Sequence, residues 1–160
     1  MMSVVIKNFQ KSTVLNLWTV RRDLLLLRSI MGLHSFNIGL IFLSSRKMKE
    51  LNAKYRSIHE PTDILSFPVH SHINESTKRN ISHEEHDLGD IFLCPQVIKS
   101  KYEVEDHNIR KIFVPLLTHG LCHLCGYLHD TEEQYEMMHN KEIEILQLFS
   151  KKTGKVFFPA

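Results

Sequence analysis

Apolar residues recur along the chain at two different spacings, and these separate strands from helices. In residues 36–42 every second residue is apolar, as in a strand with one buried face. Between Ser12 and Ile30 the apolar residues return at helical spacing, which is typical of a helix that packs one face against a core. Gly32 then provides a helix stop. The pattern predicts a helix over 12–30 followed by a strand over 36–42.

The same two patterns place the remaining elements. Strands are predicted over 3–8, 63–69 and 88–93, and helices over 45–55, after Pro95, over 108–125 and over 131–151. Pro68 has no amide hydrogen to donate, so we expect its strand to lie at a sheet edge or to end there. Pro115 is expected to kink its helix or to mark its true start. The polar residues 70–87 predict a long surface loop.

Strands mixed with helices in the first part of the chain, followed by helices alone, favour the α+β class. We expect a small mixed sheet of about four strands packed with about five helices. The chain has 160 residues, of which 42% are hydrophobic, and this is enough for one domain over 1–160 with a core that needs no disulfide staples.

The composition and the N-terminal sequence argue against some cellular locations but do not identify one. The three cysteines do not form a disulfide framework, and no apolar run is long enough to span a membrane. No secretory signal is recognisable at the N-terminus. Residues 11–31 hold four basic residues and one acid, Asp23, which suits an organelle import helix or an ordinary first core helix, and we favour the core helix. The net charge of +2 permits an anionic partner without requiring one.

The most informative stretch is a group of three histidines around a helix stop. His119 and His123 are four residues apart, so on a helix both imidazoles leave the same face. Gly126 suits the end of that helix, after which the chain can turn back and bring His129 to the same point. Three neutral nitrogens suit zinc and leave one position for water. The alternative is a histidine-rich helix whose imidazoles are solvated or hydrogen-bonded in the core.

This spacing also matches the elongated signature of zinc proteases at every position but one. In those enzymes a glutamate follows the first histidine and serves as the general base. Here that position is Gly120, which cannot accept a proton. A zinc peptidase is therefore a minor alternative.

The chain resembles the YbeY-type family of single-strand-specific, metal-dependent endoribonucleases over nearly its whole length. Three blocks carry the resemblance, and they are residues 52–56 with 61–68, residues 88–91, and residues 118–129. The resemblance implies one zinc ion per chain held by His119, His123 and His129, and an arginine matching Arg56 that is needed for activity. It also implies single-stranded ribosomal RNA as substrate and a role in ribosomal RNA processing and small-subunit maturation. The basic and apolar residues near the start, together with residues 90–93 and 118–124, resemble the mitochondrial branch of the family, and a cytoplasmic or nuclear location is the alternative.

Arg56 is the candidate for stabilising charge on a phosphodiester, because its planar guanidinium matches two phosphate oxygens and stays charged. It closes a basic run over 46–56, in which Lys49 and Lys54 are candidates for RNA binding. The run is equally explained as a solvated helix face, and Arg56 by a surface ion pair with Glu60 or Glu50.

Three carboxylates are candidates for orienting a ligating imidazole: Asp63, Asp90 and Asp130. Asp63 and Asp90 are equally explained as residues that cap a turn or close a bulge. Bacterial members usually carry Asp directly before the third histidine, where this chain has Leu128, so Asp130 would have to substitute for it.

Two cysteines, Cys122 and Cys125, lie inside the histidine motif and have the spacing of a redox or structural-zinc motif. On a helix Cys125 points about 120° away from His119, toward the core, and Cys122 lies about 60° away, near the ion and open to oxidation. Small buried thiols therefore explain the pair better than a redox or structural-zinc motif.

Two functions of different classes remain open besides the peptidase. The first is a zinc-dependent endoribonuclease, because zinc lowers the pKa of bound water toward 7 and supplies hydroxide without a carboxylate base. The second is a non-catalytic ribosome assembly factor, in which a structural zinc ion supports a basic helix that docks on RNA.

Overall fold

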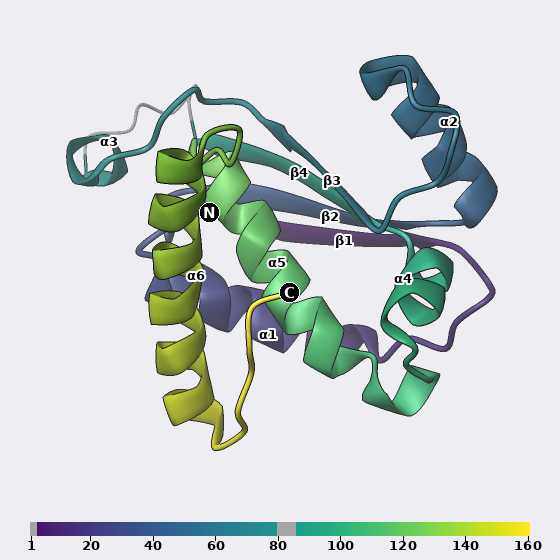
Figure 1. Cartoon of the computed structure of the whole chain (residues 1–160). Coiled ribbons are helices and arrows are strands. Elements are labelled where there is room, and N and C mark those ends of the chain that lie inside the picture. The colour runs from purple at the N-terminus through teal and green to yellow at the C-terminus, as the bar shows by residue number, and fades with distance from the viewer. Residues whose placement is uncertain (1–2, 80–85) are drawn as a thin grey trace.

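A four-stranded mixed sheet forms the centre of the molecule (Figure 1). The computed structural model describes residues 3–79 and 86–160. The strands are β1 (Val4–Phe9), β2 (Asn37–Leu43), β3 (Ile64–Pro68) and β4 (Asp87–Leu93), in the order β1-β2-β4-β3. β1, β2 and β4 are parallel, while β3 pairs antiparallel with β4 at the edge. The predicted α+β class and the edge position of the Pro68 strand are confirmed.

The helices follow the predicted order with one addition. They are α1 (Leu17–Ile30), α2 (Ser45–Arg56), α3 (Glu75–Arg79), α4 (Pro95–Tyr102), α5 (Arg110–Leu124) and α6 (Glu132–Thr153), with a 3-10 turn at Asp106–Asn108. α3 forms inside the stretch predicted as a loop, and residues 80–85 of that stretch lie outside the described residues. Within the described residues, no helix is both long and apolar enough to cross a bilayer.

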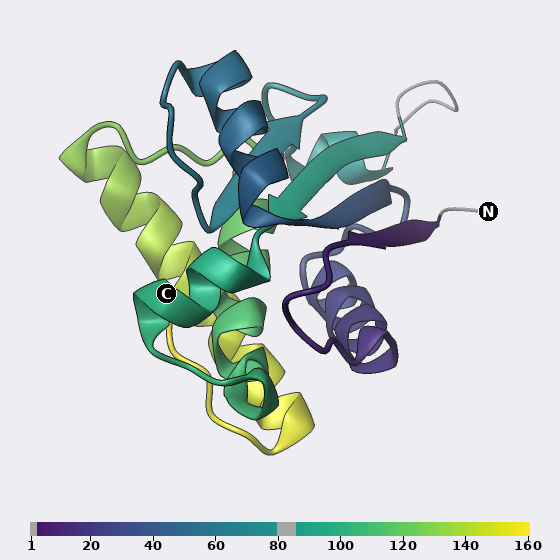
Figure 2. The same ribbon diagram turned by 90° about the vertical axis from the view of Figure 1, so that its right-hand side faces the viewer.

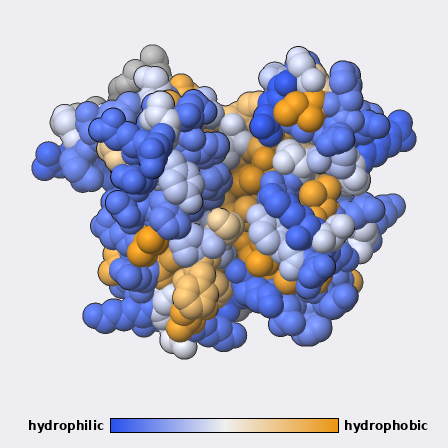
Figure 3. Space-filling model, in the orientation of Figure 1, coloured by the Kyte–Doolittle hydropathy of each residue, from blue (hydrophilic) through white to orange (hydrophobic). Residues whose placement is uncertain are grey.

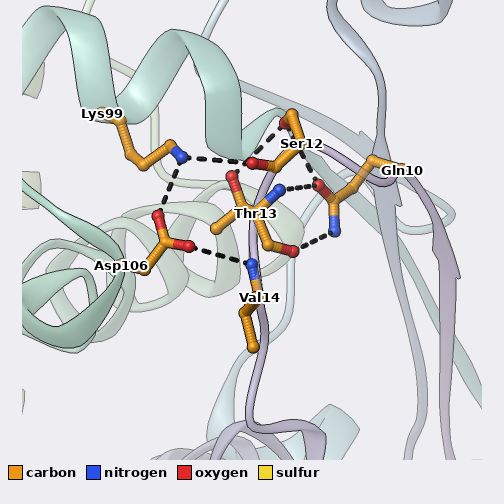
Figure 4. Close-up of polar contacts among 6 residues, drawn as sticks. All are labelled: Gln10, Ser12, Thr13, Val14, Lys99 and Asp106. Atoms are coloured by element: carbon orange, nitrogen blue, oxygen red, sulfur yellow. Dashed lines mark hydrogen bonds and ion pairs between the residues drawn. The ribbon is translucent and has the colours of Figure 1, made fainter.

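The first helix begins at Leu17 instead of near Ser12, because polar contacts hold the preceding segment in another conformation (Figure 4). Gln10 Oε1 accepts from the Thr13 amide at 3.0 Å, and Asp106 Oδ2 accepts from the Val14 amide at 3.1 Å. Lys99 Nζ donates to the other Asp106 oxygen at 2.8 Å. These bonds hold the segment before Leu17 in a non-helical conformation and tie it to α4 and the 3-10 turn.

The two faces of the sheet are covered by different helices (Figures 1 and 2). Ile38, Leu40 and Phe42 of β2 are buried in the larger core, together with side chains of α1, α5 and α6. On the opposite face, Met48 of α2 packs with Leu65 of β3 in a smaller cluster. β3 is therefore an edge strand flanked by α5 on one face and by α2 on the other.

α5 is the central helix of the larger core, and it approaches the sheet closely. A Cβ atom at Gly120 would lie 3.0 Å from Ile91 Cδ1 and 3.1 Å from Ile64 Cδ1, so both isoleucine side chains would have to shift slightly to admit even a methyl group. Pro115 lies inside the continuous helix, and the expectation that it marks the start is wrong, because the helix begins one turn earlier at Arg110.

A buried ion pair fixes the first turn of α5 to α1. Arg110 Nε and Nη2 donate to the two Asp23 oxygens at 2.7 and 2.9 Å, and the Asp23 residue is 3% exposed. A cavity of about 880 Å³ lies beside this pair, lined in part by Val20 and Phe113. The cavity does not include any of the three motif histidines, so it is separate from the candidate site.

Candidate metal centre

The last two turns of α5 bring two imidazoles together. His119 and His123 lie on one face of the helix, and their Nε2 atoms are 3.1 Å apart. Both side chains are half-buried, so the pair lies at the surface end of a helix that is otherwise packed into the core. The spacing of four residues produces the expected pair.

A glycine turn then returns the chain to this point. Gly126 has a φ of +99°, and a Cβ atom there would lie 2.6 Å from the Ser71 carbonyl oxygen, so both the conformation and the close approach require glycine. The turn places the His129 ring 5.5 Å from the His119 ring and 4.8 Å from the His123 ring, between centroids. One nitrogen from each imidazole lies within 4.8 Å of the others. The predicted three-histidine group on a helix and turn is confirmed.

Two of the three imidazoles are oriented by acceptors behind them. His123 Nδ1 donates to the Tyr127 carbonyl at 2.9 Å, and His119 Nδ1 lies 3.2 Å from Glu142 Oε1. Glu142 is a residue of α6 and is only 5% exposed. Sequence reasoning missed it, although an acid at helical spacing among Met138, Ile145 and other apolar residues was a usable signal.

The hydrogen bonds at Nδ1 determine whether the Nε2 atoms of His119 and His123 can bind a metal ion. A carbonyl only accepts, so the His123 proton is on Nδ1 and the lone pair is on Nε2. The Glu142 carboxylate selects the same tautomer for His119. Two lone pairs then face each other at 3.1 Å, which is unfavourable unless a cation lies between them. The donor set therefore fits a metal ion.

The environment of His123 also favours the neutral imidazole that a metal requires. Burial lowers the pKa of His123, and the neighbouring His119 lowers it further. His129, in contrast, is exposed on the turn and makes no hydrogen bond within the part of the chain that the structure describes. The site thus has two imidazoles oriented by hydrogen bonds and a third histidine that is exposed.

Arg56 lies at the C-terminal end of α2 and is exposed. Over residues 3–79 and 86–160 it forms no ion pair or hydrogen bond, so the alternative of a pair with Glu60 or Glu50 is not realised, and Glu50 pairs with Arg46 and Lys47 instead. Figure 3 shows the surface hollowed between the α2 side of the molecule and the side formed by α6. Arg56 makes no contact with the histidines that would fix its role.

The two lysine candidates for RNA binding are also on α2 and exposed. Lys54 Nζ lies 5.2 Å from the centroid of the Tyr55 ring. Lys49 forms no ion pair among the described residues. The basic run is therefore a solvated helix face that keeps several unneutralised charges, and both readings of it remain compatible with the structure.

The carboxylates predicted to orient an imidazole lie elsewhere. Asp63 accepts from Lys101 Nζ and from the Tyr102 hydroxyl, both at 3.0 Å, and so ties the start of β3 to α4. Asp90 is exposed over Gly39 on the open face of the sheet, whereas the next residue along β4 faces α5. These two expectations are corrected, because strand alternation and the packing of α4 turn both carboxylates away from the histidines.

Asp130 follows His129 and is exposed, and its only hydrogen bond in the described structure is from its amide to Gln134 Oε1, at 3.1 Å. Gln134 also completes the predicted capping box with Thr131 at the start of α6. Glu142 and the Tyr127 carbonyl, rather than an aspartate, orient the imidazoles.

The cysteines of the motif are fully inside the core. Cys125 is 4% exposed, as expected for a residue facing inward, but Cys122 is 0% exposed, which corrects the expectation of an oxidation-sensitive thiol beside the ion. Burial raises the pKa of Cys125 to about 11 and raises that of Cys122 further still. Both thiols are therefore protonated packing residues.

Gly120 occupies the position of the peptidase base, and it faces the sheet. Ser66 Oγ would lie 3.2 Å from a Cβ atom at this position, besides the two isoleucine methyl groups on the same side. A glutamate side chain here would have to displace these side-chain ends, and Gly120 itself carries no base, so the structure adds no support for a peptidase.

The chain is similar to one family throughout its length. The family model for Endoribonuclease YbeY matches residues 7–150. The human protein named Endoribonuclease YbeY is 35% identical over 156 residues, covering 96% of this chain and 92% of that protein. The protein of the same name from Acetivibrio thermocellus is 32% identical over 119 residues, covering 71% of this chain and 74% of the relative.

A solved structure shows the same fold. The solution structure of TM1509 from Thermotoga maritima superposes with a TM-score of 0.54 over 93% of both chains, at 21% sequence identity. With a family match over most of the chain, two relatives above 30% identity and the three-histidine group on its helix and turn, the chain belongs to the Endoribonuclease YbeY family.

Proposed function

We propose that this protein is a zinc-dependent endoribonuclease that cuts single-stranded RNA during ribosomal RNA processing and maturation of the small ribosomal subunit. The observation that carries the proposal is the convergence of three imidazoles, two of them with Nε2 lone pairs turned toward each other at 3.1 Å. The relatives at 35% and 32% identity are both named endoribonucleases, which supports RNA as the substrate.

The chain's own residues prepare this site before any ion binds. The Tyr127 carbonyl and Glu142 hold the His123 and His119 protons at Nδ1, so both Nε2 atoms present lone pairs. His129 completes the set from the exposed turn. A zinc ion held there would supply a Lewis acid that lowers the pKa of water toward 7, so no carboxylate base is needed where Gly120 stands.

Arg56 is proposed to stabilise negative charge on the phosphodiester. Its guanidinium is exposed and unpaired within the described residues, so no ion pair has to break before it binds phosphate. Lys49 and Lys54 are proposed to bind flanking phosphates from the same helix. Because α2 and α5 flank the same edge strand, a strand of RNA that crosses this edge could contact both helices.

We also propose that the substrate is pre-ribosomal RNA, that the small ribosomal subunit or its proteins are partners, and that the protein acts in the mitochondrion. The family resemblance alone supports these three points. Fractionation of cells that express the tagged chain, followed by RNA sequencing after its depletion, tests the location and the substrate.

The test of the activity combines metal analysis with RNA cleavage. The purified protein is expected to contain about one zinc ion per chain and to cut single-stranded RNA until a chelator is added. His123→Ala should remove both zinc and cleavage, whereas Arg56→Ala should keep zinc and lose cleavage. Arg46→Ala, at the other end of α2, is the control and should behave as the wild type.

Persistence of full cleavage in metal-free His123→Ala would refute the proposal, because the activity would then come from elsewhere. Zinc-loaded protein that binds pre-ribosomal particles but never cuts RNA would favour the assembly-factor alternative.

A further inference from the structure

An exposed aromatic residue, Tyr55, precedes Arg56 in α2, and its ring packs on the sheet. The Tyr55 residue is 56% exposed, and its ring packs edge-on against Phe67 of β3 with centroids 5.0 Å apart. Phe67 in turn packs edge-on against Phe92 of β4 at 5.5 Å. This row of three rings packs Tyr55 against the sheet while more than half of the residue stays exposed to solvent.

One cation lies beside this ring, and a second follows it in the sequence. Lys54 Nζ lies 5.2 Å from the Tyr55 centroid, and Arg56 is the next residue along α2. Neither cation has an acidic partner in the part of the chain that the structure describes. A stacking ring with unpaired cations beside it is the combination that binds single-stranded nucleic acid, because each base offers a flat face and each nucleotide carries a phosphate.

We propose that Tyr55 stacks on an unpaired base of the RNA and thereby selects single strands. This inference rests on the proposed function and names the residue behind its strand preference. In a duplex both faces of a base are covered by its neighbours, so an exposed ring gains nothing from it, whereas a single strand can turn a base outward.

The topology gives the strand a short route from this ring to the histidines. On β3, Phe67 faces Tyr55, and the preceding residue, Ser66, faces α5, where its Oγ would lie 3.2 Å from a Cβ atom on Gly120. β3 is the edge strand, so only this one strand separates Tyr55 from the helix that carries His119. The hollow in the surface between the α2 side and the α6 side of the molecule can be seen in Figure 3.

The chain also contains a matched control. Trp18 of α1 is 68% exposed, and the Arg22 guanidinium lies 4.9 Å from its ring. It offers the same combination of ring and cation, but α1 covers the opposite face of the sheet from α2 (Figure 2). Loss of this ring should leave RNA binding unchanged.

The experiment measures binding of zinc-loaded protein to a fluorescent single-stranded RNA of about 12 nucleotides, read by anisotropy before cleavage proceeds. Tyr55→Ala should weaken binding by about tenfold or more, while Tyr55→Phe and Trp18→Ala bind as the wild type. Tyr55→Leu keeps an apolar contact with Phe67 and removes the flat ring, so it should bind as poorly as Tyr55→Ala. Circular dichroism and zinc content confirm that each variant is folded.

A second strand of the same length, with its central bases removed, isolates stacking from charge. The wild type should bind this strand about tenfold more weakly, and Tyr55→Ala should bind both strands equally. Wild-type affinity in Tyr55→Ala, or continued discrimination between the strands, would overturn the inference even if cleavage is normal. Tyr55-dependent binding without metal-dependent cleavage would support it and refute the nuclease, and absence of RNA binding by the wild type would overturn both.

Discussion

Glu142 Oε1 lies 3.2 Å from His119 Nδ1, so a buried side chain of α6 orients a candidate metal ligand carried by α5. The orientation of that ligand therefore depends on how the two helices pack. Met138 and Ile145, which lie near Glu142 on the same face of α6, are almost fully buried in the larger core and hold the carboxylate in place.

Glu142→Gln is expected to weaken zinc binding by about 10-fold or more while the fold is preserved. Glutamine has nearly the same size and can still accept a hydrogen bond, but it lacks the charge that makes His119 a stronger ligand. Competition with a chromophoric chelator measures the zinc dissociation constant. Glu144→Gln is the matched control, because Glu144 is on the same helix and exposed, and pairs only with Lys141 among the described residues. Equal zinc affinity in both variants would show that Glu142 is only a packing residue.

Gly126→Ala is expected to destabilise the protein by about 3 kcal/mol or more and to weaken zinc binding. The added Cβ would lie 2.6 Å from the Ser71 carbonyl oxygen at a φ of +99°, so the turn that carries His129 must move. Gly154→Ala is the control that distinguishes backbone strain from a steric clash. Gly154 also has a positive φ, +74°, but no atom lies within 4 Å of the added Cβ. This substitution should cost only about 1–2 kcal/mol and leave zinc affinity unchanged. Urea denaturation measures both variants, and equal losses would rule out a special role for the Gly126 turn.

The three histidines were predictable from the sequence because their geometry is local. Residues four apart on a helix share a face, and Gly126 marks the end of that helix, so the group depends on few contacts beyond its own segment. Glu142 was missed because its position depends on how α6 packs against α5. The two explanations of Asp63 could not be separated for the same reason, since its partners Lys101 and Tyr102 are almost 40 residues away in sequence.

The start of the first helix also depends on a contact that the local sequence does not predict. Helical spacing extends back to about Ser12, yet the Val14 amide donates to Asp106, which is 92 residues away in sequence. Asn16 then caps the helix by accepting from the Thr19 amide. A long-range bond therefore decided between two conformations that the local pattern allowed equally. The expectation that the Pro68 strand lies at a sheet edge or ends there, in contrast, followed from Pro68 alone, and β3 is the edge strand and ends at Pro68.

None of the three cysteines is expected to react with Ellman's reagent in the folded protein. Cys94, Cys122 and Cys125 are each less than 5% exposed, and burial raises the pKa of each thiol, so almost no thiolate exists at pH 8. The reagent should label all three only after denaturation in guanidinium. Rapid labelling of Cys122 before denaturation would show that the end of α5 opens in solution, and would restore the idea of an oxidation-sensitive residue beside the metal.

His129→Ala and His123→Ala are expected to differ in stability although both remove a ligand. His129 is exposed and has no hydrogen bond within the described residues, so without metal its loss should change the free energy of unfolding by less than about 0.5 kcal/mol. His123 is half-buried and donates to the Tyr127 carbonyl, so its loss should cost about 1 kcal/mol or more. Zinc should stabilise the wild type strongly and both variants little, because binding to the folded state adds to stability. Urea denaturation with chelator and with zinc measures these differences, and full stabilisation of His129→Ala by zinc would mean that two histidines suffice.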